Sequence, residues 1–193
     1  MSGIEPAVSV REFFGERVAR ALRDLRLETG PATEGYLVGL LSGYAVSEQI
    51  QVLAHPLVAL LQRAMEARGA DRQLRLRELG DAALFLSGFF PDSFERRGLD
   101  ATYAATMGGR AYLLAGSQDR DDARRQVLSE LARRFVEFVR VIDEVREQTA
   151  LSSDGAVLQL YERWLRSGSP AVERRLARRG VHATRARRSG ALH

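Results

Sequence analysis

The chain of 193 residues contains no cysteine, and none of its basic residues is a lysine. The absence of cysteine excludes disulfides, thiolate nucleophiles, cysteine-based zinc sites and iron–sulfur clusters. The absence of lysine excludes a Schiff base, a lysine general base and the lysine of a phosphate-binding P-loop. All 29 basic residues are therefore arginines, and several large classes of catalytic chemistry are ruled out.

Histidine is nearly as scarce, with only His55, His182 and His193 in the chain. None of them belongs to an H-E-x-x-H motif or to the Glu-x-x-His pairs of a di-iron bundle. Neither a G-x-S-x-G nucleophile motif nor a phosphate-binding glycine loop is present. His55 precedes Pro56 and is interpreted as a residue at a helix N-terminus. We therefore expect no metal and no cofactor, we name no catalytic residue, and the sequence favours a protein that is not an enzyme.

Long apolar runs are also missing. Stretches such as Ala82–Leu86 are far shorter than the roughly 20 residues that a membrane-spanning helix requires. The first residues, Met1 to Pro6, lack the basic and apolar regions of a secretory signal. We expect a cytoplasmic protein without a transmembrane segment.

Apolar residues recur at the helical period of 3.6 along the chain, and no segment alternates as a strand would. The predicted fold class is all-α, as a single antiparallel bundle of about seven or eight helices. The predicted domain organisation is a helical domain over residues 8–168, followed by a short basic helix and an arginine-rich tail over residues 169–193.

Local signals place the helix boundaries. A capping box formed by Ser9 and Glu12 starts the first helix, and Thr33 is expected to cap the second. Proline at position 56 opens the third helix, whose predicted buried face includes Met65. The next two helices are expected to begin at Asp71 and Asp100, and to bury the side chains of Leu74, Tyr103 and Leu114 among others. A break is expected at Phe90-Pro91, since the residue before proline disfavours the helical conformation.

Residues 119–149 keep their apolar period without interruption, which predicts one helix about 45 Å long. Two further helices are expected after it, starting near Ser152 and Ser169. The acids at 119, 121 and 122 lie where a helix dipole favours negative charge, so they are interpreted as part of a helix start.

Two glycine patterns suggest tight helix packing. Gly35, Gly39 and Gly43 recur every four residues, and glycine inside a helix costs about 1 kcal/mol relative to alanine. This spacing predicts a close contact with a neighbouring helix. Gly108 and Gly109 are interpreted as a small-residue crossing between two helices, with a kink beside a ligand as the alternative.

Four phenylalanines lie around Pro91, in a segment that otherwise suggests no chemistry. They are ordinary core in the simplest interpretation, and a hydrophobic ligand pocket in the alternative. The candidate pocket residues are Phe85, Phe89, Phe90 and Phe94.

Positive charge is concentrated at the C-terminal end. From Arg166 onward there are eight arginines and one acid, so this segment carries +7 while the rest of the chain carries −3. Arginine binds phosphate in a bidentate manner, which makes nucleic acid or anionic lipid a plausible partner. A solubilising tail in an arginine-biased sequence is the alternative. The candidate nucleic-acid-binding residues are Arg174, Arg175, Arg178, Arg179, Arg185, Arg187 and Arg188.

Three functions remain open from the sequence. The first is a non-enzymatic interaction or regulatory protein that acts through protein–protein contacts, self-association included. The second is a nucleic-acid-binding accessory protein that uses the arginine-rich end. The third is a small-molecule binder or enzyme with an apolar pocket inside the bundle. An exposed apolar patch on a long helix would favour the first function, and a continuous arginine face joining the tail to the body would favour the second. A large cavity lined by Phe and Tyr, with converging Arg or Asp side chains, would favour the third.

Overall fold

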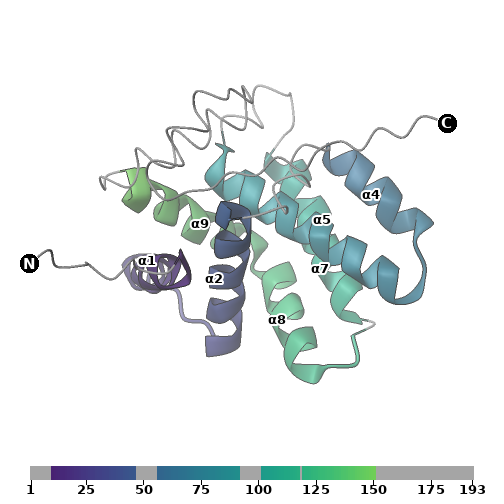
Figure 1. Cartoon of the computed structure of the whole chain (residues 1–193), viewed down its shortest axis with the longest axis horizontal. Coiled ribbons are helices and arrows are strands. Elements are labelled where there is room, and N and C mark those ends of the chain that lie inside the picture. The colour runs from purple at the N-terminus through teal and green to yellow at the C-terminus, as the bar shows by residue number, and fades with distance from the viewer. Residues whose placement is uncertain (1–9, 47–55, 92–100, 118, 151–193) are drawn as a thin grey trace, which may run out of the picture.

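The computed structural model describes residues 10–46, 56–91, 101–117 and 119–150. These residues form an all-α bundle, as predicted, and contain seven helices and no strand (Figure 1). The helices are α1 (Val10–Asp24), α2 (Pro31–Val46), α4 (Leu57–Glu66), α5 (Gly69–Phe89), α7 (Ala101–Ser117), α8 (Asp122–Arg133) and α9 (Phe135–Ala150). The helices expected after residue 150, and the boundary between residues 168 and 169, lie outside the described part.

Helix α5 is at the centre of the bundle and packs against α7, α4 and α9. Its contact with α7 is close because glycines lie at the crossing. A Cβ atom placed on Gly80 would lie 2.7 Å from the ring of Tyr112, and one on Gly108 would lie 2.8 Å from Cβ of Ala83 in α5. The Cβ atom on Gly108 would also lie 2.5 Å from the ring of Phe135 in α9. The interpretation of Gly108 as a small-residue crossing is therefore confirmed.

The glycines of α2 behave differently. A Cβ atom on Gly35 or Gly39 would meet nothing within 4 Å. The prediction that these two glycines mark a close helix contact is wrong. The residues of α2 that pack tightly are its large side chains, such as Leu37, Leu41 and Tyr44.

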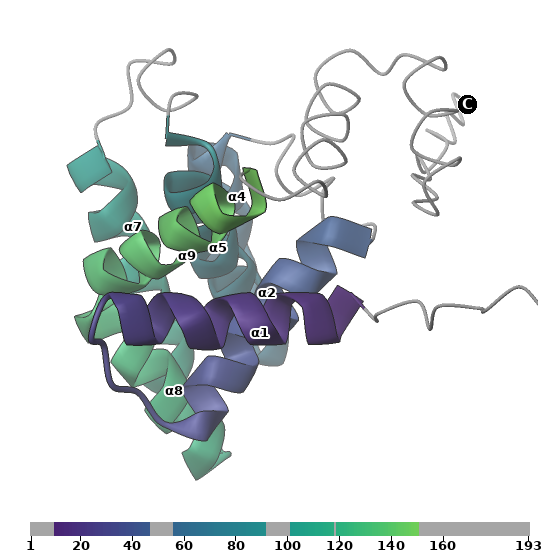
Figure 2. The same ribbon diagram turned by 90° about the vertical axis from the view of Figure 1, so that its left-hand side faces the viewer.

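Helices α1 and α2 form a pair in which α1 lies across the front of the bundle in Figure 2. Helix α1 contacts α9 as well as α2 and buries Phe14, Val18 and Leu22. Thr33 does not cap α2, which begins two residues earlier at Pro31. The amide of Glu34 donates to the carbonyl of Gly30, so the helix starts with proline in its first turn. Thr33 is instead buried and uses its hydroxyl in a contact with another helix.

The expected long helix over residues 119–149 is two helices. Arg134 separates α8 from α9 and departs from helical geometry, with φ −112° and ψ 26°. The apolar period continues through this point because Leu131, Phe135 and Phe138 are all buried. The break changes the direction of the chain, so α8 packs on α7 and α2 while α9 packs on α1 and α5.

Four side chains that the period assigned to the core are exposed. Met65 is 68% exposed, and Leu74, Tyr103 and Leu114 are 40%, 43% and 43% exposed. In α7 the buried positions are taken by small residues, such as Ala104, Ala111 and Ala115, together with Met107 and Tyr112. The face with the smaller side chains allows the closer helix contact, and periodicity alone does not reveal it.

The predicted break at Phe90-Pro91 is confirmed, since α5 ends at Phe89. Gly69 is the first residue of α5 and has a φ of +56°. Glycine adopts this left-handed conformation at no steric cost, which permits the short connection between α4 and α5. Among the described helices none is long and apolar enough to cross a membrane.

Candidate functional site

A partly buried carboxylate lies in the middle of α5. Asp81 is the only ionisable residue between Glu78 and Asp92. It accepts hydrogen bonds from the hydroxyl of Tyr36 in α2, at 2.6 Å, and from that of Tyr112 in α7, at 2.8 Å. Both hydroxyls donate to the same oxygen, Oδ1. Three helices therefore meet at one carboxylate.

The surroundings of Asp81 shift the ionisation of the whole cluster. Burial raises the pKa of Asp81 to about 6, although the hydrogen bonds from Tyr36 and Tyr112 and the charge of Arg77 act in the opposite direction. Burial, followed by the negative charge of Asp81, raises the pKa of Tyr36, Tyr44 and Tyr112 well above 10. Near pH 7 the cluster is thus a carboxylate surrounded by neutral phenols.

Several polar groups beside Asp81 have no partner within the described part of the chain. Oδ2 of Asp81 accepts no hydrogen bond from a described residue, and the hydroxyl of Tyr44 neither donates one to a described residue nor accepts one. Arg77, one turn before Asp81, is partly buried and also forms neither a hydrogen bond nor an ion pair with a described residue. It is nevertheless close enough to lower the pKa of both Asp81 and Asp119. The side-chain nitrogen of Gln73, one turn earlier still, is buried without a partner.

A second carboxylate, Glu130, is fully occupied by structural contacts. Its two oxygens accept hydrogen bonds from Thr29, at 2.8 Å, and Thr33, at 2.7 Å. Arg134 donates to Glu130 and to the backbone carbonyl of Glu28. Partial burial acts to raise the pKa of Glu130, but the hydrogen bonds from Thr33, Thr29 and Arg134 together lower it by more. The pKa of Glu130 is therefore below its usual value. This network holds the α1–α2 connection against the junction of α8 and α9.

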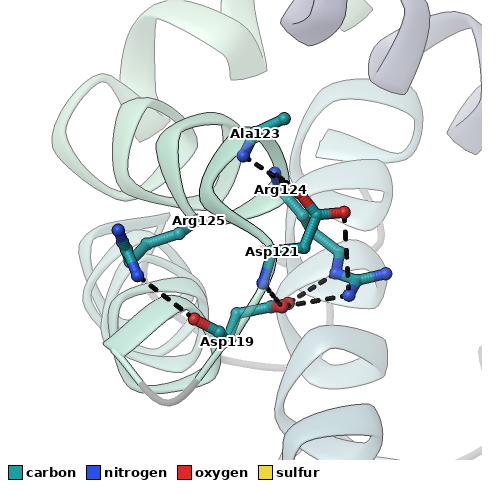
Figure 3. Close-up of polar contacts among 5 residues, drawn as sticks. All are labelled: Asp119, Asp121, Ala123, Arg124 and Arg125. Carbon is teal, nitrogen blue, oxygen red and sulfur yellow. Dashed lines mark hydrogen bonds and ion pairs between the residues drawn. The ribbon is translucent and has the colours of Figure 1, made fainter.

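The charged residues before α8 form a helix cap. Figure 3 shows that the carboxylate of Asp121 accepts from the backbone amides of Ala123 and Arg124. The guanidinium of Arg124 binds the carboxylate of Asp119, which lowers the pKa of that acid. Arg125 donates to the backbone carbonyl of Asp119. The interpretation of these acids as a helix start is confirmed, and their charges are satisfied locally.

The solvent-facing side of α7 is unusually apolar. Its exposed residues include Leu113, 54% exposed, with Leu114 and Tyr103. The 17 residues of α7 include a single charged residue, Arg110, whereas the 15 residues of α1 include seven. We call this surface the outer α7 face; it consists of Tyr103, Thr106, Arg110, Leu113, Leu114 and Ser117.

The phenylalanines predicted as core or ligand pocket are in contact with one another. Phe85 stacks on Phe89 with ring centroids 5.1 Å apart, and Phe90 lies 5.7 Å from both rings. Tyr44 stacks on the other side of the cluster, 4.4 Å from Phe85. Phe85 and Phe89 are buried, and Phe94 lies outside the described residues. The role of a ligand pocket stays a prediction.

The other predicted site residues are not placed. His55 and the seven tail arginines, Arg174, Arg175, Arg178, Arg179, Arg185, Arg187 and Arg188, lie outside the described residues. In the part that is described, no group of three or more histidine, aspartate and glutamate side chains could hold a metal ion.

Sequence reasoning did not identify Asp81. The available signal was a lone acid in an apolar segment that runs from Leu79 to Phe90. A buried acid requires hydrogen-bond donors, and Tyr36 and Tyr112 supply them from positions 45 and 31 residues away in the chain. No local pattern links these three residues, so only the fold brings them together.

Comparisons with protein-family models, with curated proteins and with solved structures found no match to this chain. Function therefore has to be inferred from the geometry of its own side chains.

Proposed function

We propose that the protein is a non-enzymatic interaction protein and that the outer α7 face contributes to its contact with another protein. The observation that carries this proposal is the exposure of Tyr103, Leu113 and Leu114 on a helix with one charge. At 1.5 Å per residue, α7 is about 25 Å long, enough to form the centre of a protein–protein interface.

The composition of this face supports the proposal physically. Helices that face water usually carry charged residues on the outside, as α1 does with seven. Contiguous exposed apolar surface costs solubility, and in soluble proteins it commonly marks a contact with a partner. The central parts of interfaces are poor in charge and rich in Tyr and Arg, the polar residue types that the outer α7 face combines with leucine.

Self-association and binding of a different protein would both use the outer α7 face, and a charge introduced there should disrupt either contact. Two measurements then distinguish the two kinds of partner. Leu113→Glu would place a carboxylate in the centre of the contact. Val136→Glu is the matched control, because Val136 is 61% exposed but lies among Arg133, Glu137 and Arg140.

Sedimentation of the full chain over a range of concentrations is the first measurement. Self-association that is present in wild type and in Val136→Glu, but absent in Leu113→Glu, supports the proposal with a second copy as the partner. If wild type is monomeric, cross-linking in cells of the native host follows, with the same two variants. A protein cross-linked to wild type and Val136→Glu but lost in Leu113→Glu then supports a different partner.

The proposal is wrong if wild type is monomeric and Leu113→Glu cross-links to the same proteins as wild type. A cytoplasmic location is part of the proposal, and it is tested by the same cross-linking in fractionated cells. Nucleic-acid binding through the arginine-rich end remains the second candidate, supported by the charge of +7 from Arg166 onward.

A further inference from the structure

The polar groups around Asp81 share no residue with the outer α7 face. Asp81 presents a carboxylate oxygen, Oδ2, that has no hydrogen-bond partner among the described residues. Its other oxygen is occupied by Tyr36 and Tyr112, which fix the orientation of the carboxylate. A carboxylate held by two hydroxyls is preorganised to accept a further donor at its free oxygen.

Arg77 lies one helical turn before Asp81, about 6 Å along the axis of α5. An aspartate and an arginine four residues apart commonly form an ion pair on a helix surface. Arg77 and Asp81 do not form this ion pair. The hydroxyls of Tyr36 and Tyr112 hold the carboxylate of Asp81, and no described residue binds the guanidinium of Arg77. Two opposite charges are thus kept apart, partly buried, on adjacent turns of one helix.

The charge pattern selects the class of ligand. A simple anion would be attracted by Arg77 but repelled by Asp81, and a simple cation would meet the reverse. A metal ion is disfavoured, since the described part of the chain offers no group of three ligands for it. A small molecule that carries both charges would pair with both residues at once and would compensate the cost of their burial.

We propose that Arg77 and Asp81 form a binding site for a small zwitterion of the amino-acid type. The ligand carboxylate binds the guanidinium of Arg77, and the ligand ammonium group donates to Oδ2 of Asp81. Tyr44 offers a further hydroxyl, and the ring of Phe85, stacked on that of Tyr44 at 4.4 Å, is one turn beyond Asp81 along α5. The side chains of Tyr44 and Phe85 are only 4% and 7% exposed, so they leave little surface for a ligand side chain, and the charges of Arg77 and Asp81 define the ligand class.

The test is calorimetric titration of the full chain with the common free L-amino acids. Acetate and methylammonium serve as probes that carry only one of the two charges. We expect at least one free amino acid to bind, and neither single-charge probe to bind as tightly. Asp81→Asn keeps the acceptor for both tyrosines but removes the negative charge, and Arg77→Gln removes the positive charge. Each variant should weaken binding roughly ten- to a hundredfold, as expected for the loss of a charged hydrogen bond.

Arg140→Gln is the matched control, because it removes an exposed guanidinium from α9 and should leave binding unchanged. If a variant does not fold, the pH dependence of binding by wild type replaces it. Binding should then weaken below about pH 6, where Asp81 becomes protonated. The phenols of Tyr36, Tyr44 and Tyr112 do not titrate there, because their pKa values are raised well above 10. The other charged groups that act on Asp81 are Arg77 and Glu78.

Two results would overturn the proposal. The first is that no free amino acid binds more tightly than acetate or methylammonium. The second is that a bound amino acid has the same affinity for folded Asp81→Asn, or for wild type below pH 5, as for wild type at pH 7. Neither result bears on the outer α7 face, whose test uses different residues and a different measurement.

Discussion

The ring of Tyr112 packs against Gly80, so close that a Cβ atom at position 80 would be 2.7 Å from Cδ1 and Cε1 of the ring. The same side chain donates its hydroxyl to Asp81, the next residue of α5. The close approach of α5 and α7 and the orientation of the carboxylate therefore depend on each other.

The substitution Gly80→Ala should destabilise the fold by about 1–3 kcal/mol, because the added methyl group has to displace a buried ring. Gly39→Ala is the control. A Cβ atom there meets nothing within 4 Å, so the better helix propensity of alanine should stabilise the protein by up to about 1 kcal/mol. Chemical denaturation measures both, and equal effects of the two substitutions would contradict the packing described for Tyr112.

Asp81 should make the stability depend on pH in an unusual direction. Its pKa is about 6 in the fold against 3.8 for an unperturbed carboxyl, so the folded state binds more protons than the unfolded state between these values. The contribution of Asp81 to stability is thus most favourable below about pH 4 and is lost as the pH rises through 6. Relative to Asp81→Asn, the free energy of unfolding of wild type should increase by about 2 kcal/mol from pH 7 to pH 4.

The difference between the two proteins is the quantity to measure, because Asp119 and Glu130 contribute in both. Their lowered pKa values make stability fall as the pH falls, and this trend cancels in the comparison. A difference that is constant with pH would mean that burial does not control the ionisation of Asp81.

Arg26 provides a prediction about the backbone. It has a φ of +52° just after α1, and the amide of Leu27 donates to the carbonyl of Leu22, which is the pattern of a helix ended by a left-handed residue. Glycine adopts this conformation without strain, so Arg26→Gly should stabilise the protein by about 0.5–1 kcal/mol. Arg23→Gly, inside α1, should instead destabilise it by about 1 kcal/mol, and thermal melting should give the two variants opposite signs.

The core of α9 can be tested with a pair of nearby residues. Phe138 is fully buried and Val136 is 61% exposed. Phe138→Ala should cost about 3–5 kcal/mol through lost burial and a cavity, whereas Val136→Ala should change stability by less than about 0.5 kcal/mol. Urea denaturation that ranks them in the reverse order would place the wrong face of α9 in the core.

The arginine-rich end is tested by truncation after Gly168, which removes seven of the eight arginines that follow residue 165. If these residues bind phosphate, the full chain should bind duplex DNA with a log–log salt slope of about −0.9 per contact. The truncated chain should lose most of this binding and keep its melting temperature. No binding by the full chain near physiological salt would exclude the nucleic-acid function for this segment.

The sequence predicted the helices well because their signals are local. The apolar period is a pattern of neighbouring residues, and it predicted the all-α fold class. Pro91 acts on the residue directly before it, and it predicted the end of α5. The break at Arg134 has no such signal, since the apolar period runs through it. The residues at the break instead make contacts with distant parts of the chain, among them the packing of Phe135 against Gly108 and the hydrogen bond from Arg134 to the carbonyl of Glu28.

The candidate sites were less predictable for the same reason. The outer α7 face was missed because period alone does not distinguish a face of small residues from a face of large ones, and Leu114 and Tyr103 were assigned to the wrong one. Asp81 gains its partners only through the three-helix junction.

The hydrogen bonds from Thr29 and Thr33 to Glu130 join residues 101 and 97 positions apart. A ribosome adds about 5–20 residues per second, so Glu130 is synthesised on the order of 5–20 s after Thr29 and Thr33. During that interval α1 lacks its contact with α9, and α2 lacks its contact with α8. Synthesis thus imposes a period in which the first two helices need shielding from aggregation, and slower translation would lengthen it.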